Sequence, residues 1–141
     1  MDRIKNLSRE LNVKSIFTGF KKNQELVDSI YAGDIFVTAS KTENQPMSIL
    51  EAMACGKSLV GVSAKGVPEL IINNKNGLIA EPDNPKELAE KIIQILGNEK
   101  LKKRFEKESL GLVQEYSTKS VAKKWIEIYE NLIKNYSADL K

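Results

Sequence analysis

Two acidic side chains, Glu43 and Glu51, are the strongest candidates for a chemical role in this 141-residue chain, and seven residues separate them. The chain has no histidine and one cysteine. This composition excludes histidine-based acid–base chemistry, histidine metal ligands, an intrachain disulfide and a cysteine-only metal site. Ionised carboxylates accept hydrogen bonds, so they suit ligands that present hydroxyl groups. We therefore expect the pair to bind a hydroxyl-rich molecule such as a sugar.

The elements around the two glutamates should form a strand–loop–helix–strand unit. Residues 34–38 are a short apolar run typical of a buried strand, and residues 40–45 are a polar loop. Pro46 suits the first position of a helix, because its missing N–H would have no partner there. Gly56 should end that helix, and residues 59–62 should form the next strand. Parallel sheets bind ligands where strands end, so the unit predicts a site at this edge.

The start of this helix indicates which ligand the site would take. The free N–H groups of Met47 and Ser48, together with the helix dipole, favour an anion such as phosphate. Glu51 lies about a turn and a half inside the helix, where it would repel phosphate but could accept two hydrogen bonds from ribose. Glu43, in the loop, could do the same for sugar hydroxyls. Together these groups predict a nucleotide-sugar site.

The two glutamates belong to an ordered set of short sequence blocks. The set contains Gly19-Phe20, residues 34–37 (DIFV), Glu43 to Glu51, residues 52–56 (AMACG), residues 66–69 (GVPE) and residues 76–78 (NGL). It resembles the C-terminal domain of the GT-B glycosyltransferases of family 4, also called group 1. The glutamate spacing is a weak signal by itself, whereas the ordered set is specific. The resemblance extends from about Leu11 to Lys134.

The resemblance implies a retaining glycosyltransferase of the hexosyltransferase type. Such an enzyme takes a nucleotide-diphospho-sugar as donor and transfers the sugar to a glycan or lipid acceptor, as in polysaccharide biosynthesis. By resemblance it needs no cofactor and no metal. Glu43 would contact the sugar in catalysis, and Glu51 would bind ribose. The N–H groups of Met47 and Ser48 would stabilise charge on the departing diphosphate.

The loop between the glutamates departs from the family pattern. The family has Gly-Phe-Gly where this chain has Asn44-Gln45-Pro46. The loop loses the flexibility of glycine, and Pro46, still a predicted substrate contact, cannot donate an N–H to phosphate. Gly19 and Phe20 match the family, which places them near the nucleobase; a turn glycine and a core phenylalanine are the alternative.

The alternation of strands and helices predicts one α/β domain over residues 1–141. We expect a partial doubly wound (Rossmann-like) parallel sheet of about four strands with a helical C-terminus. The predicted strands are residues 15–18, 34–38, 59–62 and 78–80. The last predicted helix, residues 118–135, carries a stripe around Trp125 that suits a core or a partner surface. Asn84 and Glu87 have the spacing of an N-cap residue and its capping-box acid, which predicts a helix from Pro85 to about Leu96.

By resemblance, the chain begins at the helix that follows the second strand of the family's C-terminal domain. Two strands and their basic diphosphate-binding residues would then be absent, together with the N-terminal acceptor domain. In the strand order 3-2-1-4-5-6, the absent strands separate residues 15–18 from residues 34–38. We therefore expect an N-terminally truncated half-domain, inactive alone, that another polypeptide or the acceptor domain completes. Direct pairing of residues 15–18 with 34–38 is the alternative.

Composition is ordinary for a soluble globular protein, with 41% hydrophobic and 29% charged residues and a net charge of +3. The mixed charge does not indicate nucleic-acid binding, and no apolar run is long enough to span a membrane. We expect a cytoplasmic protein. Scattered lysines at residues 100–124 allow peripheral contact with the inner membrane face. The competing function is a non-catalytic sugar-nucleotide-binding or interaction module that acts through a partner subunit.

Overall fold

The computed structural model describes residues 2–139, and the side chains of residues 2–136 among them. The strands are β1 (Ile35–Val37), β2 (Ser58–Val62) and β3 (Gly77–Ala80). The first four helices are α1 (Asp2–Glu10), α2 (Asn23–Tyr31), α3 (Met47–Ala54) and α4 (Val67–Leu70). The remaining helical elements are α5 (Pro85–Leu96), α6 (Glu99–Leu112), the 3-10 turn η1 (Val113–Tyr116) and α7 (Thr118–Asp139).

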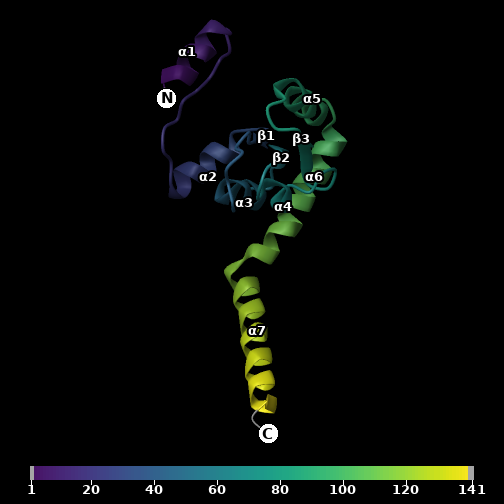
Figure 1. Ribbon diagram of the computed structural model, residues 1–141. Helices are drawn as coiled ribbons and strands as arrows, with labels where there is room; N and C mark the ends of the chain where they lie inside the picture. The colour runs from purple at the N-terminus through teal and green to yellow at the C-terminus, as the bar shows by residue number, and fades with distance from the viewer. Residues whose placement is uncertain (1, 140–141) are drawn as a thin grey trace.

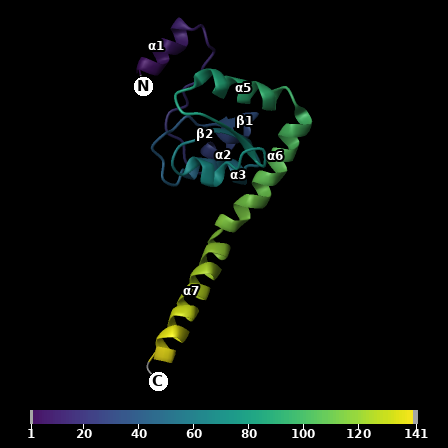
Figure 2. The same cartoon turned by 45° about the vertical axis from the view of Figure 1, so that its right-hand side comes forward.

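The three strands form a parallel sheet in the order β1-β2-β3, with Phe36 beside Leu59 and Val60 beside Leu78. Helices α2, α3 and α4 lie on one side of the sheet, and α5 and α6 on the other (Figures 1 and 2). Each strand is joined to the next through a helix, as parallel strands require. This arrangement confirms the predicted α/β class and the partial doubly wound sheet.

Strand β2 is the centre of the core, because all five of its residues are buried. Successive strand side chains point to opposite faces. Leu59 accordingly packs with the residues of α3 and α4, such as Ile49, whereas Val60 packs with Ile95 and Phe105 of α5 and α6. The two faces of one short strand thus hold both helical layers, and α3 is fixed against the sheet.

Residues 15–18 do not form the predicted strand. They lie in an extended segment without regular structure, and Ile16 is 83% exposed. This segment carries α1 away from the rest of the molecule (Figure 1). A strand persists only where a neighbour pairs with its N–H and C=O groups, and no described strand lies beside these residues. The apolar sequence pattern was therefore misleading, and the alternative of direct pairing with residues 34–38 is wrong.

Helix α7 extends from the body of the molecule (Figures 1 and 2). The large apolar side chains on its described part are exposed. Trp125 stacks on Tyr129 with ring centroids 5.8 Å apart, and the two side chains are 54% and 59% exposed. The stripe around Trp125 is therefore surface and not core. Among the described residues, no helix is both long and apolar enough to cross a membrane.

Candidate functional site

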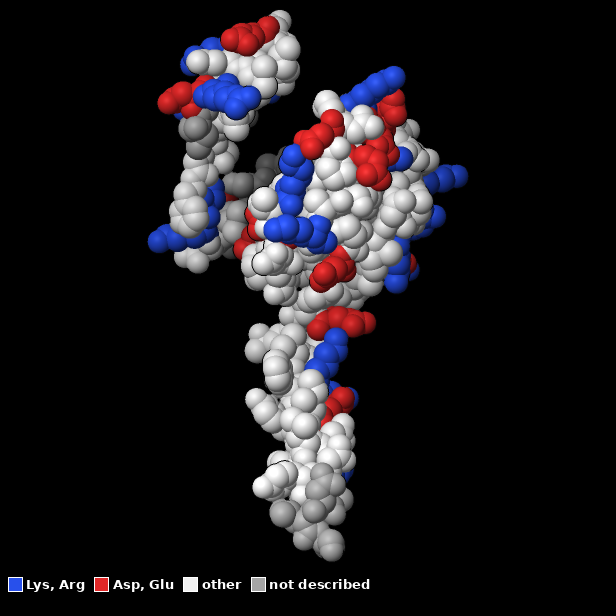
Figure 3. All heavy atoms as spheres, viewed as in Figure 1, with Lys and Arg blue, Asp and Glu red and all other residues white. Residues whose placement is uncertain are grey.

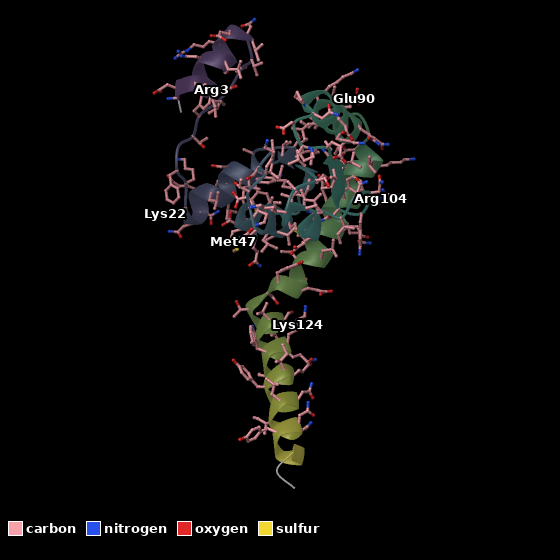
Figure 4. The ribbon with its side chains drawn as sticks, in the orientation of Figure 1. Arg3, Lys22, Met47, Glu90, Arg104 and Lys124 are labelled. Atoms are coloured by element: carbon pink, nitrogen blue, oxygen red, sulfur yellow. The ribbon has the colours of Figure 1, made fainter. Side chains whose placement is uncertain are left out.

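The loop after β1 and the start of α3 form the region that the sequence analysis singled out. Pro46 is buried and is the N-cap of α3, one position earlier than predicted. Within the described residues no side chain caps this helix. Met47 and Ser48 open the helix with exposed side chains, and Met47 lies at the lower margin of the body (Figure 4). The first N–H groups of α3, which have no partner within the helix, therefore lie at a helix start whose first side chains are exposed.

Polar contacts hold the loop that carries Glu43 at its base and on the side that faces the turn after β3. The Ser40 N–H donates to Thr38 Oγ1 at 3.3 Å, and the Ser40 hydroxyl donates to Glu43 Oε1 at 3.4 Å. On one flank Lys41 Nζ lies 2.7 Å from Asp83 Oδ1, in the turn after β3. The exposed Glu43 side chain therefore stands on a loop whose backbone has defined contacts, although the loop contains none of the glycines that the family pattern has.

Glu51 lines a cavity of about 470 Å³ between α2 and α3. Its carboxylate is half-buried, and the cavity wall is otherwise mostly apolar. The other lining residues are Asn23, Leu26, Val27, Ile30, Tyr31, Ala54 and Cys55. Glu43 is not among the lining residues, so the structure does not bring the two glutamates together in this cavity.

Gly19 and Phe20 lie in the extended segment before α2. Gly19 has a φ of +70°, the left-handed conformation that glycine adopts most easily, and it lies in a segment without regular structure. Phe20 is 91% exposed, which rules out the alternative that it is a core residue. The segment leads directly into Asn23 at the start of α2, which lines the same cavity as Glu51. Proximity of this pair to a nucleobase stays a prediction.

Cys55 ends α3 and shares the cavity wall with Glu51. Burial raises the pKa of the Cys55 thiol; the positive charge of Lys57 opposes this effect, and the negative charge of Glu51 adds to it. In the sequence, a lone cysteine next to a glycine indicates only a small buried side chain and no chemical role. Its helical spacing from Glu51 was the available signal.

Two further contacts could not be found from local sequence patterns. The ion pair between Lys41 and Asp83 joins residues 42 positions apart. Lys57 Nζ donates to the carbonyl oxygens of Tyr31 and Gly33 at 3.2 and 2.7 Å, which ties the end of α2 to the start of β2.

The described residues contain no group of three or more His, Cys, Asp or Glu side chains arranged to hold a metal ion.

Comparison with known proteins places this geometry in a family. The sequence model of the family described as "Glycosyl transferases group 1" matches residues 1–110. A Campylobacter jejuni protein named N,N'-diacetylbacillosaminyl-diphospho-undecaprenol alpha-1,3-N-acetylgalactosaminyltransferase is 37% identical over 111 residues, which are 79% of this chain and 30% of that protein. The chain therefore belongs to the group 1 glycosyltransferases, as the resemblance predicted.

Solved structures agree with this membership. The sucrose-phosphate synthase of Thermosynechococcus elongatus superposes with a TM-score of 0.82 at 25% identity, over 95% of this chain and 34% of that chain. Anabaena HepE in complex with UDP superposes with a TM-score of 0.77 at 25% identity, over 92% of this chain and 35% of that chain. The chain thus spans about a third of the length of these three relatives.

Proposed function

We propose that this chain is the donor-binding part of a retaining glycosyltransferase that uses a nucleotide-diphospho-sugar. The observation that carries the proposal is the half-buried Glu51 at the wall of a 470 Å³ cavity, on a helix that begins without a side-chain cap. A carboxylate there can accept two hydrogen bonds from a ribose diol, and the open helix terminus can bind a diphosphate. Family membership supports this assignment.

Each site residue has a separate proposed role. Glu51 binds the ribose, and the N–H groups of Met47 and Ser48 stabilise the negative charge that grows on the diphosphate. Glu43 contacts the sugar while the bond between the sugar and the diphosphate breaks and a bond to an acceptor hydroxyl oxygen forms; the hydroxyl proton passes to the departing diphosphate. Pro46 shapes the turn beneath the diphosphate. No step of this proposal passes through a metal ion or cofactor, in line with the prediction from the resemblance.

The partners follow from the chemistry of the relatives. HepE has been solved with UDP, and the Campylobacter protein is named for transfer of a sugar to an undecaprenol-linked acceptor. We propose a nucleotide-sugar donor and a glycan or lipid acceptor for the complete enzyme. An acceptor-binding domain, in the same protein or in another chain, would complete the site, so we expect little or no turnover from these 141 residues alone.

The exposed stripe of α7 favours a second candidate function, a non-catalytic sugar-nucleotide-binding or interaction module. Val121, Trp125 and Leu132 are all exposed on this helix, and an exposed apolar face of this kind marks a contact surface. A complex with a separately made acceptor domain that restores sugar transfer would support a split enzyme. A stable complex that binds donor without transfer would support the module.

Peripheral contact with an anionic membrane remains a weaker proposal for a cytoplasmic enzyme. Lys102 and Lys103 pair with Glu99, and Lys124 pairs with Glu115. Acidic and basic side chains alternate over the visible face of the molecule (Figure 3). Such a mixed surface attracts anionic lipid weakly. Co-sedimentation with liposomes of anionic lipid tests this point, and absence of binding would count against it.

The donor-binding proposal predicts that Glu51→Ala weakens nucleotide binding. Calorimetric titration of the chain with UDP, GDP and ADP should identify one preferred nucleoside diphosphate. Loss of a hydrogen bond to a charged group costs about 1.5–3 kcal/mol, so the Kd of the variant should rise roughly 10- to 100-fold. Glu90→Ala is a matched control, because Glu90 is an exposed helix carboxylate on α5, far from α3 (Figure 4).

Two outcomes would contradict the proposal. If none of the three nucleotides bound to the wild-type chain, the site would have no support as a donor site. If Glu51→Ala and Glu90→Ala bound the preferred nucleotide equally well, Glu51 would not be the ribose contact.

A further inference from the structure

Gly66 packs directly against the backbone of the loop that carries Glu43. The Gly66 N–H donates to the carbonyl oxygen of Glu43 at 3.1 Å. A β-carbon at Gly66 would overlap the carbonyl oxygen of Asn44 and would lie 2.7 Å from its carbonyl carbon and 3.3 Å from the Glu43 carbonyl oxygen. All three neighbours are backbone atoms. Unlike the tip of a flexible side chain, they cannot move aside without displacing the whole loop.

The backbone conformation of Gly66 does not itself require glycine. Its φ of −70° and ψ of −6° lie in the right-handed region that every L-residue adopts. Glycine is therefore needed here for space alone. This separates Gly66 from Gly19 and Gly56, whose positive φ angles favour glycine through conformation.

Burial indicates which of the two segments, α4 or the Glu43 loop, would move if Gly66 carried a side chain. Val67, the residue after Gly66, is fully buried and packs in the core with Ile49 and Leu70. Glu43 and Asn44 are exposed, and their loop is held mainly by the contacts described above. Displacing a fully buried residue disrupts core packing, whereas an exposed loop can shift with little loss. An added methyl group would therefore move the Glu43 loop and leave α4 in place.

We propose that Gly66 is a positioning residue. Because Gly66 has no side chain, the Glu43 loop can pack directly on the turn before α4. This contact, the seat of the loop, sets where the Glu43 carboxylate contacts the donor sugar. The inference rests on the proposed function only for the identity of that ligand. Glu51 lies on α3, and the buried Pro46 separates α3, with the N–H groups of Met47 and Ser48, from the displaced residues. Sugar recognition and nucleotide recognition should therefore separate in a Gly66 variant.

The test is Gly66→Ala in the 141-residue chain, with two readouts. The first is the set of backbone amide resonances in ¹H–¹⁵N spectra. We expect those of residues 43–45 to shift, while those of Val67 and of α5 remain near their wild-type positions. The second is binding of UDP-glucose and of UDP. We expect the Kd for UDP-glucose to rise about tenfold, as for Glu43→Ala, while the Kd for UDP is unchanged.

Two other glycines provide matched controls. In Gly61→Ala the new β-carbon would lie 2.7 Å from Val67 Cγ1 and 2.8 Å from Ile71 Cδ1, so the crowding falls on the core and not on the loop. In Gly111→Ala it would meet nothing within 4 Å. A general loss of stability would appear in Gly61→Ala as well, whereas selective loss of UDP-glucose binding should be confined to Gly66→Ala and Glu43→Ala.

The outcomes separate this inference from the proposed function. Unshifted resonances of residues 43–45 in Gly66→Ala would overturn the inference, and so would equal loss of UDP and UDP-glucose binding. If the wild-type chain bound no nucleotide, the proposed function would fail, while the resonance shifts would still decide whether Gly66 seats the loop. If Gly66→Ala did not fold, hydrogen exchange of the wild-type Gly66 amide would decide: slow exchange supports the seat, and exchange at the free-peptide rate refutes it.

Discussion

At the scale of single residues, the site depends on carboxylates whose surroundings differ. Glu43 is exposed on a loop, whereas Glu51 is half-buried in the wall of a cavity. The mostly apolar wall makes an interaction between Glu51 and a ligand stronger than the same contact in open water. Under the proposed function, we therefore expect Glu51 to contribute more of the nucleotide affinity than Glu43. Cys55 lies in the same cavity wall, so its reactivity can report on charge and ligand binding in the cavity.

Alkylation of Cys55 should respond to the charge of Glu51. The Cys55 pKa is raised first by burial, is lowered by Lys57 and is raised further by Glu51. Glu51→Gln removes a negative charge that disfavours the thiolate, so the pKa should fall and the thiolate fraction at a fixed pH below it should rise. Iodoacetamide should therefore react faster with Cys55 in this variant, as mass spectrometry over a pH series can measure.

The chain has one cysteine, so the alkylation signal is unambiguous. Glu90→Gln provides the control and should leave the rate unchanged. Slower alkylation in Glu51→Gln would contradict the electrostatic account. A bound nucleoside diphosphate should slow the reaction in the wild-type chain, because ligand in the cavity would cover the thiol.

At the scale of elements, helix ends follow the sequence closely. Asn84 Oδ1 accepts the Glu87 N–H at 3.1 Å, as predicted for an N-cap, whereas Glu87 Oε2 accepts from the Asn84 side-chain amide at 3.2 Å and not from the Asn84 backbone N–H, which donates to the Glu81 carbonyl oxygen. The same carboxylate accepts the Glu81 N–H at 3.0 Å, which joins the end of β3 to the start of α5. This turn also holds Asp83, the partner of Lys41, so the cap of α5 supports the loop of Glu43.

Asn84→Ala should lower the free energy of unfolding by about 1 kcal/mol, because the Glu87 N–H loses its partner. Urea unfolding followed by circular dichroism measures the change. Gln94→Ala, at an exposed position in the same helix, is the control and should change the free energy by less than about 0.5 kcal/mol. Equal effects of the two substitutions would show that the cap contributes nothing specific.

At the scale of the whole molecule, a compact α/β body carries two projecting elements. The body holds the core on both faces of the sheet, whereas α1 and α7 extend from it (Figure 1). On the visible face, charged side chains are dense on the body, and much of α7 is uncharged (Figure 3). We therefore expect the stability of the chain to depend on the body and its associations to depend on α7.

The double substitution Trp125→Gln and Leu132→Gln should leave the free energy of unfolding of the body within about 0.5 kcal/mol of wild type, because both side chains are more than half exposed. It should reduce binding of a hydrophobic dye and of a separately made acceptor domain. Urea unfolding and analytical ultracentrifugation measure the two properties.

Val113→Gln is the contrasting variant, because Val113 packs against the core formed by α3, α4 and β2. It should cost about 1–3 kcal/mol, because a polar amide replaces an apolar side chain that is partly buried against this core. If the α7 variant lost as much stability as Val113→Gln, the helix would be part of the folded core and not a contact surface.

Local sequence patterns predicted the fold class, the capped helices and the strand–loop–helix–strand unit around Glu43 and Glu51. These features depend on side-chain periodicity and on backbone groups a few residues apart, which a single stretch of sequence contains. The same patterns were wrong for residues 15–18, and they placed Pro46 one position too far into α3. A strand needs a neighbouring strand, and an apolar run of four residues carries no information on whether that neighbour exists.

The amino-acid sequence by itself determined the chemistry available to this protein: two carboxylates about one helix start, no histidine, and the family to which the chain belongs. The tertiary structure alone decided how that chemistry is placed. It packed α2 beside α3 to form the cavity at Glu51, tied Lys41 to Asp83, and seated the Glu43 loop on Gly66. Each of these contacts joins distant parts of the chain or depends on the space between them, and that space is set by the packing of the helices on the sheet.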